Sequence, residues 1–294
     1  MTNTIVKNYM TITNTINELA SIQLEPTAAC RGKVHRLVDS LMPTYWLQHP
    51  LKANSIISRC RKNPRDLTAN SFGCKDASLI DDFQRASIYR ESAFYAAGCD
   101  DGKIENADII AMIETSKLHR EGHAFGREKI AVSHWLIKRD IDMVIICHPK
   151  VFVDSRVSDP VNDMQRNYLR LLERFPDQAL LPEYDKFVEF IAGQFAKIVP
   201  EGENHQYMIS AYFAHNAFDT VEGIIYPSAQ TQGHLGFNVA IRPDVKDDAL
   251  EFIDAQECVL YKADNYMPVQ AGRYSDSQIS TFLGVDVNTM PWID

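Results

Sequence analysis

The chain has 294 residues, 45% of them hydrophobic, and a formal net charge of −9. This length is enough to bury a sizeable core, either as one large domain or as a core with an added subdomain. The acidic balance argues against direct binding of DNA or RNA, because affinity for a nucleic-acid backbone depends largely on a cationic face. A small anionic ligand held by a few local arginines remains compatible with it.

The six cysteines are scattered, with no CxxC pair and no Cys/His cluster at zinc spacing. This pattern predicts reduced thiols rather than a disulfide framework. The N-terminal stretch has an early lysine and interleaved Thr and Asn instead of an apolar run, so it does not resemble a signal peptide. No window approaches a membrane span of about 18 apolar residues. We therefore expect a cytoplasmic protein without membrane contact.

Residues 1 to 50 predict a helical extension. Apolar residues recur at helix spacing from Ile5 to Leu19, and again from Ala28 to Leu41 before a proline. We interpret these helices as a layer that covers an edge or a face of the core. A surface for a partner or for a second copy of the chain is the alternative.

Residues 55 to 61 alternate around β-branched residues and predict a strand. Arg59 and Arg61 lie two positions apart, so their side chains point to the same face of that strand. They are either a solvated edge or a phosphate-binding pair, because a guanidinium matches phosphate oxygens two at a time. Residues 62 to 84 are polar and predict a loop.

Residues 85 to 114 are the stretch that we expect the rest of the chain to serve. Arg85 precedes a short apolar strand that carries Tyr95, and a helix with apolar residues at helix spacing ends near Glu114. A cation, an aromatic ring and a carboxylate on one strand–turn–helix unit suit a phosphorylated ligand that carries a ring. Three other acids are rivals to Glu114, but loop solvation or helix capping suits them better: Asp100, Asp101 and Glu105.

The second half of the chain alternates between strand and helix patterns. Residues 130–137 and 143–146 are β-rich runs bridged by charged residues, which predicts a hairpin in the core sheet. Residues 159 to about 217 predict three helices, separated by two Pro-containing breaks, whose aromatic residues suit a core.

Two further strands follow the helices. Residues 222–227 and 235–241 predict a hairpin whose tip presents Ser228. Residues 252 to 261 predict the last strand.

Four side chains beside these strands and turns fit cleavage of a nicotinamide–ribose bond: Arg85, Tyr95, Glu114 and Ser228. The reaction builds positive charge on the anomeric carbon, which a carboxylate stabilises. An arginine neutralises pyrophosphate and an aromatic ring stacks on nicotinamide. The reaction needs no metal.

Each of these residues also has an ordinary structural interpretation. Arg85 suits a surface ion pair, Tyr95 a core position, Glu114 a helix surface and Ser228 the cap of a turn. A serine hydrolase, with His234 or His215 as the base, is disfavoured because the sequence before the serine lacks the G-x-S-x-G elbow.

Several segments resemble the RES domain, the toxin component of a class of bacterial toxin–antitoxin pairs: RASIYRESAFYAA, an acidic residue that closes the next helix, and GIIYPSAQ followed by LGFNVAIRPD. The family places an arginine ten residues before an active-site tyrosine, as Arg85 and Tyr95 are placed here. The family's glutamate, on the following helix, matches Glu114. Its serine lies in a Tyr-Pro-Ser turn and matches Ser228.

The resemblance covers roughly residues 55 to 262. It implies an α+β fold related to ADP-ribosyltransferases, with a split mixed sheet and NAD in the cleft. The implied activity is that of an NAD phosphorylase, which would use inorganic phosphate, or an NAD glycohydrolase. ADP-ribosyl transfer to a protein target and a non-catalytic NAD-binding module are the alternatives. Family toxins are usually neutralised by a helix-turn-helix antitoxin, which implies such a partner.

The resemblance also implies roles for single residues. The motif SRCR is similar to the family's first arginine motif and leaves the choice between Arg59 and Arg61 open. Either arginine would hold phosphates together with Arg85, Tyr95 would position nicotinamide, and Tyr226 and Asn238 complete the NAD-binding set. Glu114 would stabilise the ribosyl cation, and Ser228 would bond ribose or the carboxamide.

The implied organisation has three parts. These are a helical extension over residues 1–50, a RES-like domain over 51–265 with a helical insertion at about 155–217, and a tail over 266–294 packed on the core.

Overall fold

The computed structural model describes residues 2–41, 47–99, 103–121, 124–154, 156–263, 269–270 and 276–293. In these ranges, nine strands form one sheet in the order β1-β5-β6-β7-β3-β2-β4-β8-β9, and of the described strand pairs only β5–β6 is parallel. The strands are β1 (Gln48–Leu51), β2 (Ile56–Lys62), β3 (Phe94–Gly98), β4 (Gly126–Ile137), β5 (Ile141–Ile145), β6 (Gly223–Pro227), β7 (Phe237–Ile241), β8 (Leu250–Lys262) and β9 (Val269–Gln270). The protein therefore has a mixed α+β fold.

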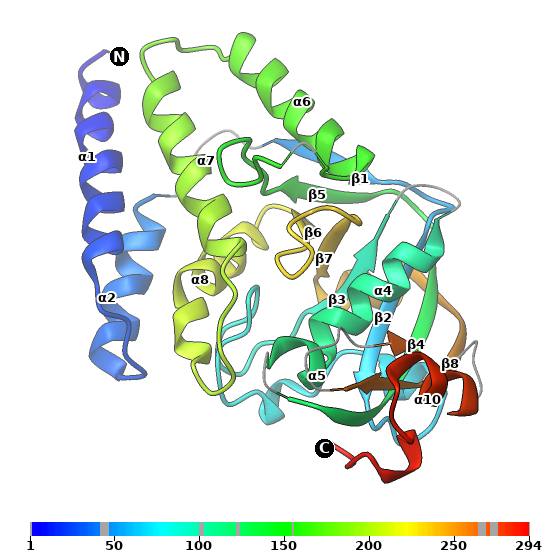
Figure 1. The fold of residues 1–294 in the computed structure, drawn as a ribbon. Helices are drawn as coiled ribbons and strands as arrows, with labels where there is room; N and C mark the ends of the chain where they lie inside the picture. The colour runs from blue at the N-terminus through cyan, green and yellow to red at the C-terminus, as the bar shows by residue number, and fades with distance from the viewer. Residues whose placement is uncertain are drawn as a thin grey trace.

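Helices cover both faces of the sheet (Figure 1). On one face, four helices share a hydrophobic cluster with β5, β6 and β7: α1 (Thr2–Ser21), α2 (Ala28–Asp39), α7 (Leu181–Phe195) and α8 (Met208–Ala217). The opposite face packs against α3 (Ala69–Phe72), α6 (Asp159–Glu173) and α9 (Pro243–Ala249). The predicted helical extension and the predicted helical insertion thus pack together, and the boundaries between domains stay predictions.

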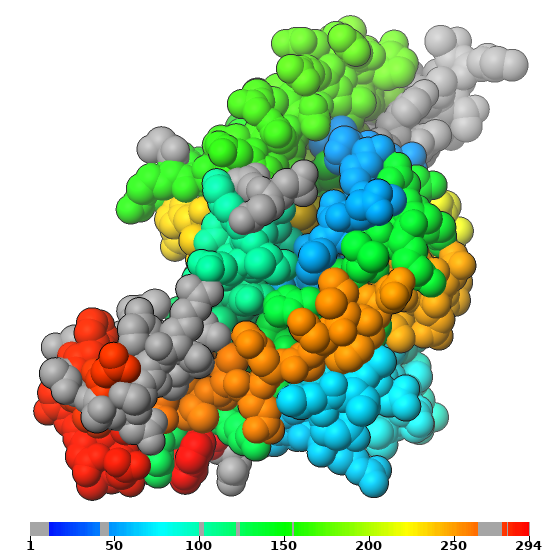
Figure 2. All heavy atoms as spheres, turned by 90° about the vertical axis from the view of Figure 1, so that its right-hand side faces the viewer, coloured from blue at the N-terminus to red at the C-terminus, as the bar shows by residue number. Residues whose placement is uncertain are grey.

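Shorter helices complete the fold. Helix α4 (Ile104–Thr115) packs across β2 and β3, and α5 (Lys117–Arg120) follows it directly. The single helical turns are η1 (Ala77–Leu79), η2 (Asn204–Tyr207) and η3 (Val287–Thr289). Helix α10 (Asp276–Leu283) and η3 pack on the end of β8. In Figure 2, β8 (orange) crosses the visible face between α4 and the segment after β2 (cyan).

The sheet is almost interrupted between β2 and β3. These strands share one registered pair, Ser58 with Ala97, whereas β3 shares five with β7 and β2 shares seven with β4. Beyond Ser58 the two strands diverge, and the guanidinium of Arg59 donates a hydrogen bond of 2.7 Å to the carbonyl of Tyr95. A side chain thus satisfies a backbone group that a neighbouring strand would otherwise pair.

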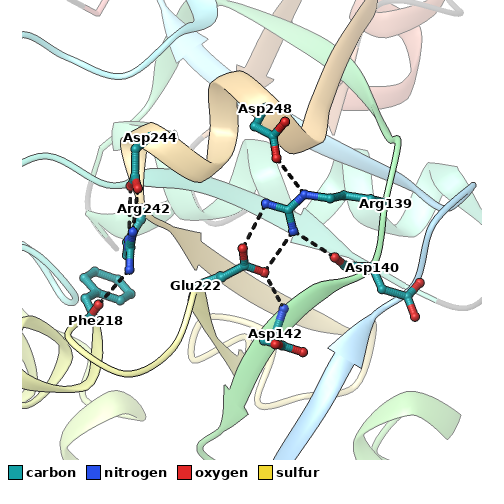
Figure 3. A network of polar contacts seen from close by, with 8 residues as sticks. All are labelled: Arg139, Asp140, Asp142, Phe218, Glu222, Arg242, Asp244 and Asp248. Carbon is teal, nitrogen blue, oxygen red and sulfur yellow. Dashed lines mark hydrogen bonds and ion pairs between the residues drawn. The ribbon is translucent and has the colours of Figure 1, made fainter.

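The predicted hairpin of residues 130–137 and 143–146 is wrong. β4 pairs with β2 and β8, whereas β5 pairs with β1 and β6. The charged residues between β4 and β5 contact other elements: Arg139 donates hydrogen bonds to Glu222 at 2.8 Å and to Asp248 at 2.7 Å (Figure 3). Glu222 in turn accepts the amide of Asp142 at 2.9 Å. This network holds the start of β5 beside the start of β6.

Most other predicted elements are confirmed within a few residues, including the three helices after residue 159 and the hairpin of β6 and β7. Strand β1 is a correction, because it lies at the boundary of the predicted helical extension and adds an edge strand beside β5. Ser228 is a second correction, because its side chain is fully buried instead of presented at a hairpin tip.

None of the helices in the described ranges combines the length and the apolar character needed to cross a bilayer.

Candidate functional site

A cavity of about 350 Å³ opens where β2 and β3 diverge. Its volume lies within the range of about 300–1,000 Å³ that is typical of small-molecule sites. Residues of strands β2, β3, β6 and β7, of helices α4 and α5 and of the turn η2 line it. Its lining includes Arg59, Arg85, Tyr95, Glu114, Arg120, Tyr207, Tyr226, Gln230 and Asn238. Three of the four predicted catalytic side chains therefore line one cavity.

Glu114 lies in the last turn of α4, and its carboxylate is held by two donors. Ser228 Oγ and Asn238 Nδ2 each donate a hydrogen bond of 2.8 Å to the same oxygen, Oε1. Ser228, the fourth predicted catalytic residue, is thus connected to the cavity through its hydrogen bond to Glu114. A helix, the β6–β7 loop and β7 together fix the carboxylate at the cavity.

The hydroxyl of Ser228 is engaged within the protein. It donates to Glu114 and accepts the amide of Thr231 at 3.3 Å, and the amide of Ser228 donates to the carbonyl of Gly236 at 3.2 Å. Gly236 has a φ of 154°, and a Cβ there would collide with the carbonyl oxygen of Gly98. The hydroxyl of Ser228 thus holds the carboxylate of Glu114, and its predicted contact with ribose or the carboxamide stays a prediction.

Tyr95 and Arg85 are coupled through the segment before β3. The phenol oxygen of Tyr95 accepts the amide of Ala86 at 3.0 Å and lies 2.8 Å from the hydroxyl of Ser87. Burial raises the pKa of Tyr95 to about 12, so the phenol is neutral. Tyr95 therefore anchors the segment that begins with Arg85.

Arg85 is a buried cation enclosed by aromatic rings. Its side chain is 7% exposed, and its guanidinium lies 4.9 Å from the ring centre of Tyr207 and 5.9 Å from that of Tyr226. It also donates to the carbonyl of Phe195. Tyr226, a predicted ligand-binding residue, is 3% exposed and also lines the cavity. Arg85 thus places a positive charge at the cavity. Part of its hydrogen-bonding capacity is already taken up by the carbonyl of Phe195.

Arg59 and Arg61 point away from the face of β2 that meets Glu114. Cα pairing places Ser58, Ala97 and Asn238 on the face that carries Glu114, and the alternation of side chains directs Arg59 and Arg61 to the opposite face. There Arg59 lies 4.6 Å from the ring centre of Phe94, and both arginines donate to the carbonyl of Gly73.

The environment of these two arginines also differs from that of an exposed phosphate-binding pair. Burial, and then the charge of Arg61, lower the pKa of Arg59 to about 9. Arg59 still borders the cavity, but Arg61 is not part of its lining. Of the two arginines between which the resemblance leaves the choice open, Arg59 is thus the one that borders the cavity, and its contact with phosphates stays a prediction.

Sequence reasoning missed several residues of the cavity. Arg120 lies between the predicted helix that ends near Glu114 and the predicted strand over residues 130–137, and Gln230 follows the Tyr-Pro-Ser turn. Asn204 and Tyr207 come from η2, between the predicted helices. No motif points to them, because their proximity arises from the tertiary fold. Of the rival acids, Glu105 lies in the first turn of α4, and Asp100 and Asp101 lie outside the described residues.

A polar network links the cavity to strand β8. Ser58 donates to Asp108 at 2.6 Å, His134 lies 3.0 Å from the same carboxylate, and its other nitrogen lies 2.6 Å from Asp254. The hydrogen bond with Asp108, and then that with Asp254, raise the pKa of His134 to about 9 against the cost of burial. The imidazolium thus joins α4, which carries Glu114, to β4 and β8.

This network predicts a dependence of stability on pH. Because folding raises the pKa of His134, its contribution is complete below an unfolded pKa of about 6.5 and is lost as the pH rises to about 9. We expect the unfolding free energy of the native chain to fall by about 1–3 kcal/mol more than that of His134→Gln between about pH 6 and pH 9.5. Urea unfolding of both proteins across that range measures the difference, and parallel curves would contradict it.

A second group of polar residues has the composition of a metal site. His148, Asp185 and Glu189 place potential ligand atoms within 4.8 Å of one another. The ring nitrogen Nδ1 of His148 accepts the amide of Lys150, so in the neutral ring Nε2 carries the proton and faces Asp185 at 3.1 Å. The ammonium of Lys150 lies 3.0 Å from Glu189. We interpret the group as a polar contact between α7 and the segment after β5.

Comparisons of the chain with models of known protein families and with curated proteins find no match.

Proposed function

We propose that the chain binds NAD in the cavity between β2 and β3 and cleaves the bond between nicotinamide and ribose. The observation that carries this proposal is the position of Glu114, a carboxylate held by Ser228 and Asn238 at a cavity that also contains Arg85 and Tyr95. A fixed negative charge stabilises a developing ribosyl cation without needing to reorganise. The resemblance of the Arg–Tyr–Glu–Ser pattern to the RES domain supports the same chemistry.

The reaction balances without a redox step. The bond from the anomeric carbon to the pyridinium nitrogen breaks, and its electron pair leaves with nicotinamide as a neutral ring. Glu114 stabilises the remaining ribosyl cation until an oxygen of water or of inorganic phosphate bonds to the carbon. The acceptor's proton passes to solvent. Arg85 contributes positive charge near the anionic part of the dinucleotide.

The fold is compatible with the proposed family. An ADP-ribosyltransferase-like split sheet is our proposal for the architecture, and the single registered pair between β2 and β3 supports it. We extend the proposal to a toxin acting in the cytoplasm and to a helix-turn-helix antitoxin as its partner, on the resemblance alone.

Incubation of the purified protein with NAD, with and without phosphate, tests the proposal. We expect release of nicotinamide, with ADP-ribose as the product in water or its 1-phosphate when phosphate is the acceptor, identified by mass. Binding of NAD without release would indicate a non-catalytic module. A protein acceptor that gains the mass of ADP-ribose would indicate a transferase. Absence of both binding and release would contradict the assignment of the site.

A further inference from the structure

Helix α5 is a single helical turn whose last residue borders the cavity. Arg120 lines the cavity next to the end of α4, and within the described ranges its guanidinium forms no ion pair and no side-chain hydrogen bond. The nearest acidic influence is Glu201, whose pKa is lowered first by a hydrogen bond with Glu121 and then by the charges of Lys117, Lys62 and Arg120, but no hydrogen bond or ion pair joins Glu201 to Arg120 in the described ranges. A cation thus borders the site with its donors uncommitted to the described part of the chain.

The start of this turn is fixed by a buried carboxylate from β4. Glu128 is 1% exposed and accepts hydrogen bonds from Ser116 Oγ at 2.5 Å and from the amide of Lys117 at 3.0 Å. The ammonium of Lys62 lies 2.9 Å from the same side chain. Burial alone would raise the pKa of Glu128, but these contacts outweigh it and the pKa is lowered. Glu128 is therefore ionised and bound to the helix start.

The end of the turn is fixed by a buried ammonium from β8. Lys262 is 7% exposed and donates to the carbonyls of Leu118 at 2.8 Å and Glu121 at 3.1 Å. These carbonyls lie at the end of the helix, where no amide of the same helix is available to donate a hydrogen bond to them. Two buried charges of opposite sign, from neighbouring strands, thus fix the two ends of α5.

Burying these two charges costs solvation free energy, and an isolated helical turn is unstable in water. One consequence is that Arg120 projects from a rigid support, so less conformational entropy is lost when it binds an anion. The other cavity arginines are less suited to that role. Arg85 already donates to Phe195, and Arg59 donates to Tyr95 and Gly73.

We propose that Arg120 is the residue that binds the phosphate groups of the substrate, and that the substrate class is therefore a nucleotide rather than a nucleoside. The planar guanidinium matches phosphate oxygens two at a time. The inference rests on the proposed function, because it concerns the same cavity. Glu114 then acts on the ribosyl carbon while Arg120 holds the phosphorylated end.

The test compares three substrates that share the scissile bond: NAD, nicotinamide mononucleotide and nicotinamide riboside, which lacks phosphate. Arg120→Gln should lower kcat/KM for NAD and for the mononucleotide by about 10- to 100-fold, the range for loss of one hydrogen-bonded charge. The riboside should be cleaved by Arg120→Gln and by the native chain at rates within about twofold. Arg120→Lys should be intermediate for the two phosphorylated substrates.

Lys117→Gln is the matched control, because it removes one positive charge from the same turn at a residue outside the cavity lining. It should leave all three substrates nearly unchanged. An equal loss for the three substrates in Arg120→Gln would reassign Arg120 to support of the fold. No loss for any of them would also overturn the inference.

Binding of ADP-ribose separates this inference from the proposed function, because it needs no turnover. If the native chain releases no nicotinamide, the proposed function fails, and calorimetry with ADP-ribose still decides the role of Arg120. A roughly tenfold or larger loss of affinity in Arg120→Gln, with Lys117→Gln unchanged, supports it. Equal affinity in the two variants, or no binding to the native chain, overturns it.

Discussion

Replacement of Glu114 by Gln should lower the rate of nicotinamide release by about 100- to 1,000-fold, the loss typical when one preorganised electrostatic group is removed from an active site. The amide oxygen of Gln can still accept the hydrogen bonds from Ser228 and Asn238, so the position of the side chain is retained. What is lost is the negative charge beside the anomeric carbon. Release of nicotinamide, followed under saturating NAD, measures the effect.

Two comparisons show whether the charge is responsible. Glu105→Gln changes an exposed carboxylate in the first turn of the same helix and should leave the rate unchanged. Affinity for NAD should change much less than the rate, because the interaction is made mainly in the transition state. A Glu114→Gln protein that unfolds cooperatively and turns over at the native rate would remove Glu114 from the mechanism.

Replacement of Glu128 by Ala should lower the unfolding free energy by about 3–5 kcal/mol, the usual effect of removing one partner from a buried ionic contact. The substitution leaves the ammonium of Lys62, the hydroxyl of Ser116 and the amide of Lys117 without their shared acceptor. Urea unfolding at neutral pH measures the loss.

The depressed pKa of Glu128 adds a second expectation for the same residue. Its stabilisation is present above an unfolded pKa of about 4.3 and is lost as the pH falls through the lower folded pKa, so the native chain and Glu128→Ala should converge in acid. Glu257, an exposed carboxylate on β8 paired with Lys129, is the control, and Glu257→Gln should cost at most about 1 kcal/mol. Similar losses for the two variants would contradict this account.

Local features of the fold were predictable because they depend on neighbouring residues. The spacing of Ile5 to Leu19 predicts α1, and the apolar run before Gly98 predicts β3, because side-chain period alone distinguishes such segments. Strand pairing was less predictable. Residues 130–137 and 143–146 look like the arms of a hairpin, but β5 pairs with β6, and Arg139 just before the start of β5 binds Glu222, which is 83 residues away. No local pattern encodes that contact.

In the candidate site, too, local features were predictable and features that depend on the tertiary fold were not. Alternation correctly places Arg59 and Arg61 on one face of β2, but it does not tell which face meets α4, because that depends on how β2 joins β3. The pattern that led to Arg85, Tyr95, Glu114 and Ser228 selects residues that the fold does bring together. Arg120 has no sequence signal of its own, since its position depends on Glu128 and Lys262.

The near-interruption of the sheet has a mechanical consequence. With one registered pair between β2 and β3, backbone bonding contributes little to the cohesion of the two halves, which depends instead on α4 and on side chains that span the gap. A molecule seated in that gap touches both halves and supplies cross-links that the polypeptide lacks. If the proposed ligand binds there, we therefore expect its binding to make the sheet more rigid.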